Sequence, residues 1–346
     1  MKRLINILTS YILPLTLFSC TSSHKEEISV LQFNIWQEGT MVENGFNAIV
    51  DNIIKVNPDM VTFSEVRNYD NVDFISNLIA ALEKKGVTYY GESSVSTGII
   101  SKHPIIEQTV IYPYINDQGS VLKAMIEVED KTVALYSAHL DYKHYACYLP
   151  RGYSGATWEK LKEPIIDPDS ILAANRKSRR LEAVEAIIAD SKKEIQKKHI
   201  VIIGGDFNEP SHLGWTENTK DLWDHNGAVV EWDCSRVLYE NGFKDTYRER
   251  YPNVVEYPGF TFPSDNLNAP VSKLTWAPDA DERERIDFIY FHPTQNITLK
   301  DAVIVGPPSS IVRSQRVEEQ SNDKFIAPSG VWPTDHKGVL SIFEIK

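Results

Sequence analysis

Short apolar runs alternate with segments of helical spacing over the first half of the chain, and this alternation constrains the fold more than any other feature. Residues 28–35 and 60–65 are predicted strands, because β-branched and aromatic residues dominate them over strand length. Between them, apolar residues recur at helical spacing from Phe46 until Asn57-Pro58 ends the helix. The pattern predicts an α/β fold, with helices covering the faces of a sheet.

The same pattern extends along the rest of the chain. A second helix is predicted over 74–82, with Gly86 as its C-terminal stop, and a long helix over 170–195. Further strands are predicted near 89–93, 97–101, 122–128, 132–138, 199–203, 287–291 and 338–345. The run at 199–203 is apolar and β-branched throughout, which is typical of a strand buried on both faces.

Two long segments, near 142–169 and 209–280, are irregular and rich in Tyr, Trp, Pro and Gly. Ser/Gly-rich or Pro-rich linkers and internal repeats are absent from the sequence, so we expect one domain over 28–346 with two loop insertions. Substrate choice is usually encoded in such insertions.

Composition and charge narrow the function. The 346 residues are 42% hydrophobic and 24% charged, which is the balance of a chain that buries a core. The formal net charge of −12 repels polyanions at long range, which argues against a protein that coats DNA. A phosphate-bearing ligand would need a local basic pocket or metal ions.

The N-terminal residues predict export. A basic start at Lys2-Arg3, an apolar stretch over 4–18 and the ending Leu17-Phe18-Ser19-Cys20 resemble a bacterial lipobox, in which Cys20 receives a diacylglycerol. An ordinary secretory signal or a buried first helix are the alternatives. We therefore expect a signal peptide over 1–19, a polar tether over 20–27, and attachment to the bacterial outer membrane through lipid alone, on its periplasmic or cell-surface face.

Two further cysteines, Cys147 and Cys234, lie in the two insertions. In an oxidising compartment a disulfide between them is one expectation, and two separate thiols are the other, because sequence separation says nothing of their distance.

Polar residues directly follow or open several predicted strands. They are Asn34, Glu65, His139, Asp206, Asn208, Asp287, Asp335 and His336. Active sites of α/β proteins collect at this edge of the sheet, although an acid after a strand is more often a turn or helix-cap residue. Gly204-Gly205-Asp206-Phe207-Asn208 is a stronger signal, because two glycines allow close approach to a ligand and are followed by a carboxylate and an amide.

Seven blocks in this order resemble the endonuclease/exonuclease/phosphatase superfamily, the DNase I-like phosphohydrolases. They are Asn34-Ile35-Trp36, Glu65-Val66, Gly98-Ile99-Ile100-Ser101, Ala138-His139-Leu140-Asp141, Gly204-Gly205-Asp206-Phe207-Asn208, Arg285-Ile286-Asp287-Phe288-Ile289-Tyr290 and Thr334-Asp335-His336. The resemblance runs from residue 30 to residue 345. It implies a four-layer α/β sandwich, in which two mixed β-sheets lie face to face and helices flank them.

The resemblance also implies hydrolysis of phosphate esters with a divalent metal. Glu65 is the implied principal ligand, helped by Asn34 and Asp335, and these hard oxygen donors suit Mg²⁺ or Mn²⁺. By the same resemblance, Asp206 and Asn208 position the attacking water, the phosphate or a second metal. His336 paired with Asp287 is the implied general base.

His139 is implied to stabilise the phosphate or protonate the leaving group. Arg151, in the loop after the His139 strand, is a candidate substrate contact. The basic run over 176–180 is expected to be a solvated helix face.

The substrate stays open between nucleic acid (a DNA or RNA nuclease), a sugar or inositol phosphate, and a phospholipid headgroup (a sphingomyelinase-like hydrolase). An inactive surface lipoprotein that only binds ligands is the alternative from another class. We expect a monomer. Tryptophans 158, 215, 223 and 232 are expected mainly to form the insertions' own small core, although aromatic faces can also stack on bases or sugars.

Overall fold

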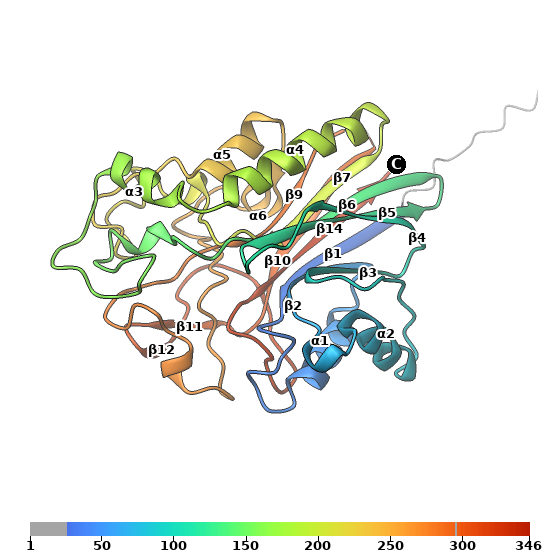
Figure 1. The fold of residues 1–346 in the computed structure, drawn as a ribbon, viewed down its shortest axis with the longest axis horizontal. Coiled ribbons are helices and arrows are strands. Elements are labelled where there is room, and N and C mark those ends of the chain that lie inside the picture. The colour runs from blue at the N-terminus through green and yellow to red at the C-terminus, as the bar shows by residue number, and fades with distance from the viewer. Residues whose placement is uncertain (1–25, 295) are drawn as a thin grey trace, which may run out of the picture.

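The computed structural model describes residues 26–294 and 296–346, so the predicted signal peptide, Cys20 and most of the tether lie outside the described residues. Two six-stranded mixed sheets pack face to face with helices on their outer sides (Figure 1). The predicted four-layer α/β sandwich is therefore confirmed. The inserted segments gather at one end of the sandwich, away from the C-terminus.

The first sheet has the order β13-β10-β14-β1-β2-β3. Its strands are β13 (Phe325–Ile326), β10 (Ile297–Val305), β14 (Gly338–Ile345), β1 (Glu26–Asn34), β2 (Met60–Val66) and β3 (Ser96–Ser101). β1 runs parallel to β2, with Asn34 beside Ser64 in the register. This pairing brings the ends of two strands together and sets Asn34 next to Glu65.

The second sheet has the order β4-β5-β6-β7-β9-β8. Its strands are β4 (Ile105–Tyr112), β5 (Gly119–Val128), β6 (Lys131–Leu140), β7 (Ile200–Asp206), β9 (Asp287–Phe291) and β8 (Lys244–Asp245). β6 and β7 are parallel and pair His139 with Asp206, while β7 and β9 are antiparallel and pair Asp206 with Asp287. Three predicted site residues thus stand in one row across neighbouring strands.

Apolar layers hold the sandwich together. Buried residues of both sheets form the central core, which includes Val30, Met60, Leu135 and Ile202. The helices α1 (Gly45–Val56) and α2 (Phe74–Lys84) bury their apolar sides against the first sheet, as their sequence spacing predicts. The helices α4 (Arg180–Gln196) and α5 (Asp233–Glu240) pack on the second sheet.

The contact between the sheets becomes polar close to the site, where Ser137 Oγ donates to the Phe63 carbonyl at 3.0 Å. The two glycines of the Gly204-Gly205 block lie here, inside β7. A Cβ on Gly204 would stand 2.2 Å from Thr62 Oγ1 of the facing sheet, and one on Gly205 would stand 2.5 Å from the Ala138 carbonyl. The glycines therefore allow β7 to pack closely on its neighbouring strand and on the facing sheet, rather than the close approach to a ligand that the sequence suggested.

The predicted helix over 170–195 is two helices, α3 (Pro168–Asn175) and α4, separated by a short break. The basic run over 176–180 occupies that break and is not one solvated face. Arg176 pairs with Asp233 and Arg179 with Glu182, while the buried Arg180 donates to the backbone carbonyls of residues 141, 143 and 144. Arg176 thus joins α5 of the second insertion to the break, and Arg180 joins the loop after β6 to α4.

Other elements were not predicted. They are the strands β4, β8, β10, β13, β11 (Ser309–Val312) and β12 (Gln315–Glu318), the helices α5 and α6 (Thr246–Arg250), and the short 3₁₀ turns η1 (Tyr69–Asn71), η2 (Ala146–Tyr148), η3 (His212–Gly214) and η4 (Val271–Lys273). The predicted strand near 89–93 is reduced to one bridge, between Tyr90 and Ser101. The second insertion is thus partly helical instead of irregular.

Cys147 and Cys234 are separate buried thiols, so the disulfide expectation is wrong. Cys147 packs in the core of the insertions with Trp215 and Trp232, whereas Cys234 packs between α5 and the second sheet. They belong to two different apolar clusters.

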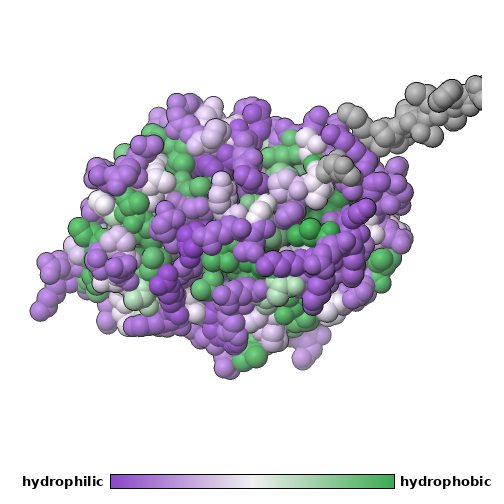
Figure 2. Space-filling view, turned by 90° about the horizontal axis from the view of Figure 1, so that it is seen from above, coloured by the Kyte–Doolittle hydropathy of each residue, from purple (hydrophilic) through white to green (hydrophobic). Residues whose placement is uncertain are grey.

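The outer face seen from above α4 is mainly hydrophilic, with apolar residues in small patches between charged ones (Figure 2). Within the described residues, no helix is long and apolar enough to cross a membrane.

Candidate active site

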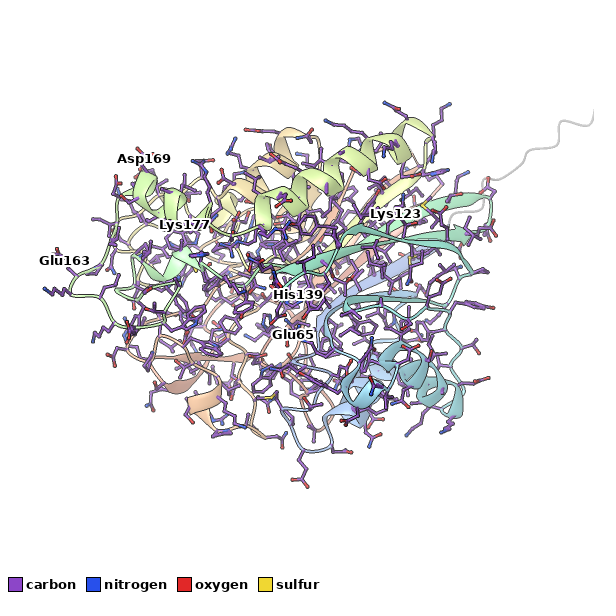
Figure 3. The ribbon with its side chains drawn as sticks, viewed as in Figure 1. Glu65, Lys123, His139, Glu163, Asp169 and Lys177 are labelled. Carbon is purple, nitrogen blue, oxygen red and sulfur yellow. The ribbon has the colours of Figure 1, made fainter. Side chains whose placement is uncertain are left out.

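A pocket of about 290 Å³ opens where the strands of both sheets end and the insertions begin. Figure 3 shows Glu65 and His139 at this end of the sandwich, one from each sheet. The predicted site residues that line it are Glu65, His139, Asp206, Asn208, Asp335 and His336. Asn34 and Asp287 lie behind these residues and are hydrogen-bonded to them. The fold therefore brings all eight catalytic and metal-binding candidates together.

Glu65 sits on a β-bulge. The register of β2 against β3 shifts between Ser64 and Val66, and Glu65 has a φ of 72°, in the left-handed region that non-glycine residues rarely adopt. The bulge turns the carboxylate out of the sheet and into the pocket. Its Oε2 accepts a hydrogen bond from the Gln37 backbone amide at 2.9 Å, which fixes the side chain.

Asn34 connects the two halves of the site. Its Nδ2 donates to Glu65 Oε1 at 3.2 Å and to Asp206 Oδ2 at 2.9 Å, so that one amide holds two carboxylates from different sheets. Its Oδ1 accepts from the Trp36 amide at 2.9 Å. Because Asn34 is completely buried, these bonds fix its orientation.

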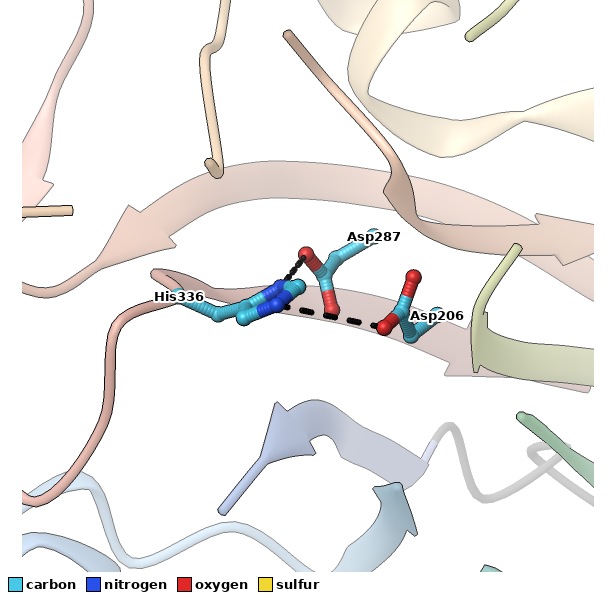
Figure 4. A group of neighbouring side chains, drawn as sticks. All are labelled: Asp206, Asp287 and His336. Atoms are coloured by element: carbon cyan, nitrogen blue, oxygen red, sulfur yellow. Dashed lines mark hydrogen bonds and ion pairs between the residues drawn. The ribbon is translucent and has the colours of Figure 1, made fainter. Parts of the chain in front are cut away.

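His336, Asp287 and Asp206 form a compact group (Figure 4). His336 Nδ1 lies 2.9 Å from Asp287 Oδ2, which places a proton on Nδ1, and its Nε2 lies 4.0 Å from Asp206 Oδ2. Asp287 is fully buried and also receives a hydrogen bond from Gln32 Nε2 at 3.4 Å. The imidazole is therefore oriented with Nε2 toward the pocket.

The site carries more negative than positive charge. Burial raises the pKa of Asp206 to about 7, with a further contribution from the Asp287 carboxylate. Burial likewise raises the pKa of Asp335 to about 7, and the Glu65 carboxylate adds to the effect. Burial alone would lower the pKa of His336, but the surrounding carboxylates of Asp287 and Asp206 raise it to about 10. Such a cluster of carboxylates attracts cations.

The donors present fit a divalent cation. Glu65 and Asp335 both line the pocket, and the Asp335 carboxylate accepts a long hydrogen bond, at 3.5 Å, from Thr334 Oγ1. The two carboxylates are hard oxygen donors, which Mg²⁺ and Mn²⁺ prefer. Asn34, expected as a further ligand, directs its Nδ2 and not its oxygen at Glu65, so in this structure it positions that carboxylate. Asp206, Asp287 and His336 could also share an ion by proximity. Their mutual hydrogen bond, however, already uses His336 Nδ1.

His139 is neutral in this environment. Burial, with a smaller contribution from the nearby Arg67, lowers its pKa to about 3. Its Nδ1 lies 2.9 Å from Ser96 Oγ, so the hydroxyl fixes the ring while the imidazole lines the pocket. A neutral imidazole can donate a hydrogen bond to an anionic oxygen without carrying a positive charge.

Asn208 lies at the end of β7 with a φ of 48°. Its backbone amide donates to Asp206 Oδ1 at 2.9 Å, and its Nδ2 donates to the Leu140 carbonyl at 3.0 Å. The loop after β7 is therefore tied to the end of β6, and Asn208 holds the Asp206 carboxylate in place.

Arg151 does not face the pocket, which corrects the expectation that it contacts substrate. Its guanidinium is buried and pairs with Glu284 at 2.7 Å, and it also donates to the carbonyls of Cys147 and Asp281. Trp215 Nε1 donates to the same Glu284 at 3.3 Å. Arg151 thus joins the two insertions from within.

Several pocket residues were missed from the sequence. They are Gln37, Arg67, Asp117, Tyr142, Tyr145, Tyr148, Phe262 and Trp276. Most of them lie in loops, where the spacing of apolar residues does not predict which side chains face a pocket. Of the tryptophans singled out in the sequence, Trp215 and Trp232 are buried in the insertions' core as expected, while Trp158 lines the pocket.

Comparison with known proteins agrees with this geometry. A model described as the endonuclease/exonuclease/phosphatase family matches residues 31–336. An uncharacterised protein of Caenorhabditis elegans is 32% identical over 348 residues, which cover 98% of each chain.

Similar folds occur among solved structures. The human Nocturnin catalytic domain with bound sulfate has a TM-score of 0.53 at 13% identity, and the match covers 92% of this chain and 95% of that one. The TDP2 of D. rerio complexed with a single-strand DNA product has a TM-score of 0.50 at 15% identity, with 92% and 98% covered. An endonuclease/exonuclease/phosphatase from Bacteroides vulgatus has a TM-score of 0.50 at 13% identity, with 93% and 100% covered. These likenesses show the shared fold.

Proposed function

Because the chain belongs to the endonuclease/exonuclease/phosphatase family and is a phosphoester hydrolase, we propose that it uses Mg²⁺ or Mn²⁺ held by Glu65 and Asp335, with Asn34 holding the Glu65 carboxylate in place. The observation that carries this proposal is the convergence of buried carboxylates in one pocket, where burial and then the neighbouring carboxylates raise the pKa of Asp206 and Asp335 to about 7. A divalent cation would supply the missing positive charge and would polarise the phosphoryl group.

His336 and Asp287 supply the general base. Asp287 Oδ2 accepts a hydrogen bond from the protonated Nδ1 of His336 at 2.9 Å. Nε2 is therefore the nitrogen that takes a proton from the attacking water. Burial lowers the pKa of His336, but the Asp287 and Asp206 carboxylates raise it overall. Positive charge held by Glu65 and Asp335 would favour the neutral, basic imidazole. Asp206, which lies 4.0 Å from Nε2 and is held by Asn34, positions the water.

His139 donates a hydrogen bond to a phosphoryl oxygen. Its lowered pKa makes it a poor source of a proton for the leaving group, but a neutral N–H aimed into the pocket stabilises negative charge that grows on the phosphate. The sequence left two roles open for His139, stabilising the phosphate and protonating the leaving group, and the lowered pKa favours the first.

The alternative of an inactive binding protein is not retained, because the whole catalytic set is present in one pocket. A nuclease acting on DNA or RNA and a sphingomyelinase-like headgroup hydrolase remain the alternatives within the family. The net charge of −12 argues against a long polyanionic substrate.

Hydrolysis of two nitrophenyl esters tests the proposal. We expect Mg²⁺ or Mn²⁺ to support release of p-nitrophenolate from p-nitrophenyl phosphate or from bis(p-nitrophenyl) phosphate, and the preferred ester separates monoesterase from diesterase activity. Exhaustive EDTA treatment should abolish release, and added Mg²⁺ should restore it. Full activity in EDTA would overturn the metal-dependent mechanism.

We further propose that the enzyme works as an exported monomer, held at a bacterial outer membrane by a lipid on Cys20. The support is the sequence around Leu17, Ser19 and Cys20. Native protein should partition into detergent, and Cys20→Ser should make it soluble without changing turnover. Unchanged partitioning of that variant would reject the lipid anchor.

A further inference from the structure

We propose that the pocket selects a small phosphate ester in which the phosphoryl group is attached to one ring-bearing group, a nucleoside or a sugar. The ring would pack on five aromatic residues of the insertions that line the pocket: Tyr142, Tyr145, Tyr148, Trp158 and Trp276. We refer to them as the aromatic wall. The inference rests on the proposed function, since the phosphate must lie at the metal site.

The outer part of the aromatic wall is exposed. Trp276 is 50% exposed and Tyr142 is 40% exposed, although both are large aromatic side chains. The Trp276 ring lies 5.6 Å from that of Trp158, which in turn contacts Tyr148 at 5.7 Å. Aromatic surface beside a catalytic pocket is available to stack on a ligand ring.

The wall is preformed. Its two segments, from different insertions, are fastened through Glu282, which accepts a hydrogen bond from Tyr148 Oη at 2.5 Å and others from the backbone amides of Trp276 and Ala277 at 3.1 Å. Lys160 and Asp279 add an ion pair at 2.7 Å. A rigid wall loses little conformational entropy when a ring packs on it.

The wall adjoins the reacting groups. Phe262 lies between them, with its ring centroid 4.9 Å from that of His336, and both residues line the pocket. A phosphoryl group near His336 and a ring on the wall therefore fit within one continuous cavity. At about 290 Å³, that cavity is at the lower end of the ~300–1,000 Å³ typical of ligand sites, which suits a single nucleoside or sugar.

Charge argues against a polymer. Arg67 is the only Lys or Arg among the pocket-lining residues of the described chain, and its Nη1 already pairs with Asp117 at 2.6 Å. Glu65, Asp206 and Asp335 line the same pocket. A polynucleotide would bring further phosphates that need cations of their own, whereas a small ester brings only the phosphate that the metal neutralises.

Binding of defined probes to the native protein and three variants tests the inference. Trp276→Ala removes the most exposed part of the wall, Trp276→Phe retains an aromatic face, and Tyr90→Ala is a matched control, since Tyr90 is 47% exposed outside this pocket. The probes are adenosine 5′-monophosphate, glucose 6-phosphate, inorganic phosphate and a 20-nucleotide single-stranded DNA. Dissociation constants are measured in Mg²⁺ by tryptophan fluorescence and by competition with nitrophenyl ester hydrolysis.

We expect at least one ring-bearing ester to bind at least tenfold more tightly than inorganic phosphate. Trp276→Ala should remove about tenfold of that affinity, as expected for a lost stacking partner. Trp276→Phe should restore most of it, and Tyr90→Ala should change nothing. Tighter binding of the nucleotide identifies a nucleoside, and tighter binding of the sugar phosphate identifies a sugar.

Equal affinity for both ring-bearing esters and for inorganic phosphate would overturn the inference. So would a Trp276→Ala variant that loses as much affinity for inorganic phosphate as it loses for the ring-bearing esters. Tighter binding of the DNA than of either small ester would favour a polymer substrate and would also overturn it. The two proposals fail separately. Wall-dependent binding without any ester hydrolysis would contradict the proposed function alone, whereas metal-dependent hydrolysis without wall dependence would contradict this inference alone.

Discussion

Glu65 holds its carboxylate in the pocket at an energetic cost. A non-glycine residue in the left-handed region costs about 1–2 kcal/mol, and the neighbouring strand β3 begins with a second such residue, Ser96 at φ 70°. Ser96 in turn orients His139. Backbone strain on the paired strands β2 and β3 therefore presents two of the functional side chains, and packing of the sandwich sustains it.

Substitutions of the two histidines should have different consequences. His336→Ala should lower turnover on every ester by ~10²–10⁴, as for a lost general base. His139→Ala should lower turnover similarly on aryl and alkyl phosphates, because a neutral donor stabilises the phosphate in both cases. His139→Gln should recover part of the loss, since its amide can still donate.

Turnover of both variants on p-nitrophenyl and alkyl esters checks these assignments. A His139→Ala defect confined to the alkyl ester would instead indicate that His139 protonates the leaving group.

His225 provides a prediction about pH and stability. Burial lowers its pKa to about 2, and its ring stacks on Trp215 at 3.7 Å. His225 is therefore protonated near pH 6.5 in the unfolded chain, but it stays neutral at that pH in the folded protein. This contribution to stability is present above pH 6.5 and is lost as pH falls toward 2.

Replacing His225 with Phe keeps the stack and removes this titration. From pH 6 to pH 4, the free energy of unfolding of the native protein should fall relative to that of His225→Phe, by about 1.4 kcal/mol per pH unit. Urea unfolding at several pH values measures the difference. Parallel pH profiles for the two proteins would contradict the account.

At the scale of single elements, one buried ion pair fixes α4 on the second sheet. Lys123 of β5 is 6% exposed and donates to Asp190 at 2.7 Å and to Glu194 at 3.1 Å, both on α4. Lys123→Ala would leave two carboxylates without this partner and should lower the free energy of unfolding by about 3 kcal/mol. Lys131→Ala, which removes an exposed pair with Asp130, is the control. Equal midpoints of denaturation in the two variants would contradict a structural role for Lys123.

Elements with a clear local pattern could be predicted. The ranges 287–291 and 338–345 coincide with β9 and β14, because buried strands read as continuous apolar runs. β4 was not predicted, because it is an edge strand whose residues are mostly exposed or half-buried. A bulge between Leu299 and Asp301 breaks the alternation of β10. The interruption after α3 was hidden because residues 175–180 include neither Gly nor Pro, the residues that usually mark the end of a helix.

The site residues likewise divide into those that could be predicted from the sequence and those that could not. Residues at strand ends could be predicted, since the sheet topology brings such ends together, and all eight meet at one pocket. The structural role of Arg151 could not be predicted from the sequence. Its buried pair with Glu284 depends on how segments far apart in the sequence fold against each other. The exposure of Trp276 depends on the same tertiary packing.

At the scale of the whole molecule, the sandwich serves to bring two sheets' strand ends into one acidic pocket. The first sheet contributes Asn34, Glu65 and the residues that precede β14, and the second contributes His139, Asp206 and Asp287. Asn34 and the His336–Asp287 pair cross between the sheets. A cation at this junction would stabilise the folded protein as well as the reaction.

The most direct test is the dependence of nitrophenyl ester turnover on Mg²⁺ concentration in three proteins: native, Glu65→Gln and Glu163→Gln. Glu163 is an exposed carboxylate of the first insertion, remote from Glu65 in Figure 3. We predict that native protein and Glu163→Gln are inactive in EDTA and regain equal activity with Mg²⁺. Glu65→Gln should require much more Mg²⁺ and lose ~10²–10³ in turnover, as when a main electrostatic contribution to catalysis is removed. Activity that persists in EDTA, or a Glu65→Gln variant that matches native protein in Mg²⁺ dependence and turnover, would contradict the central claim.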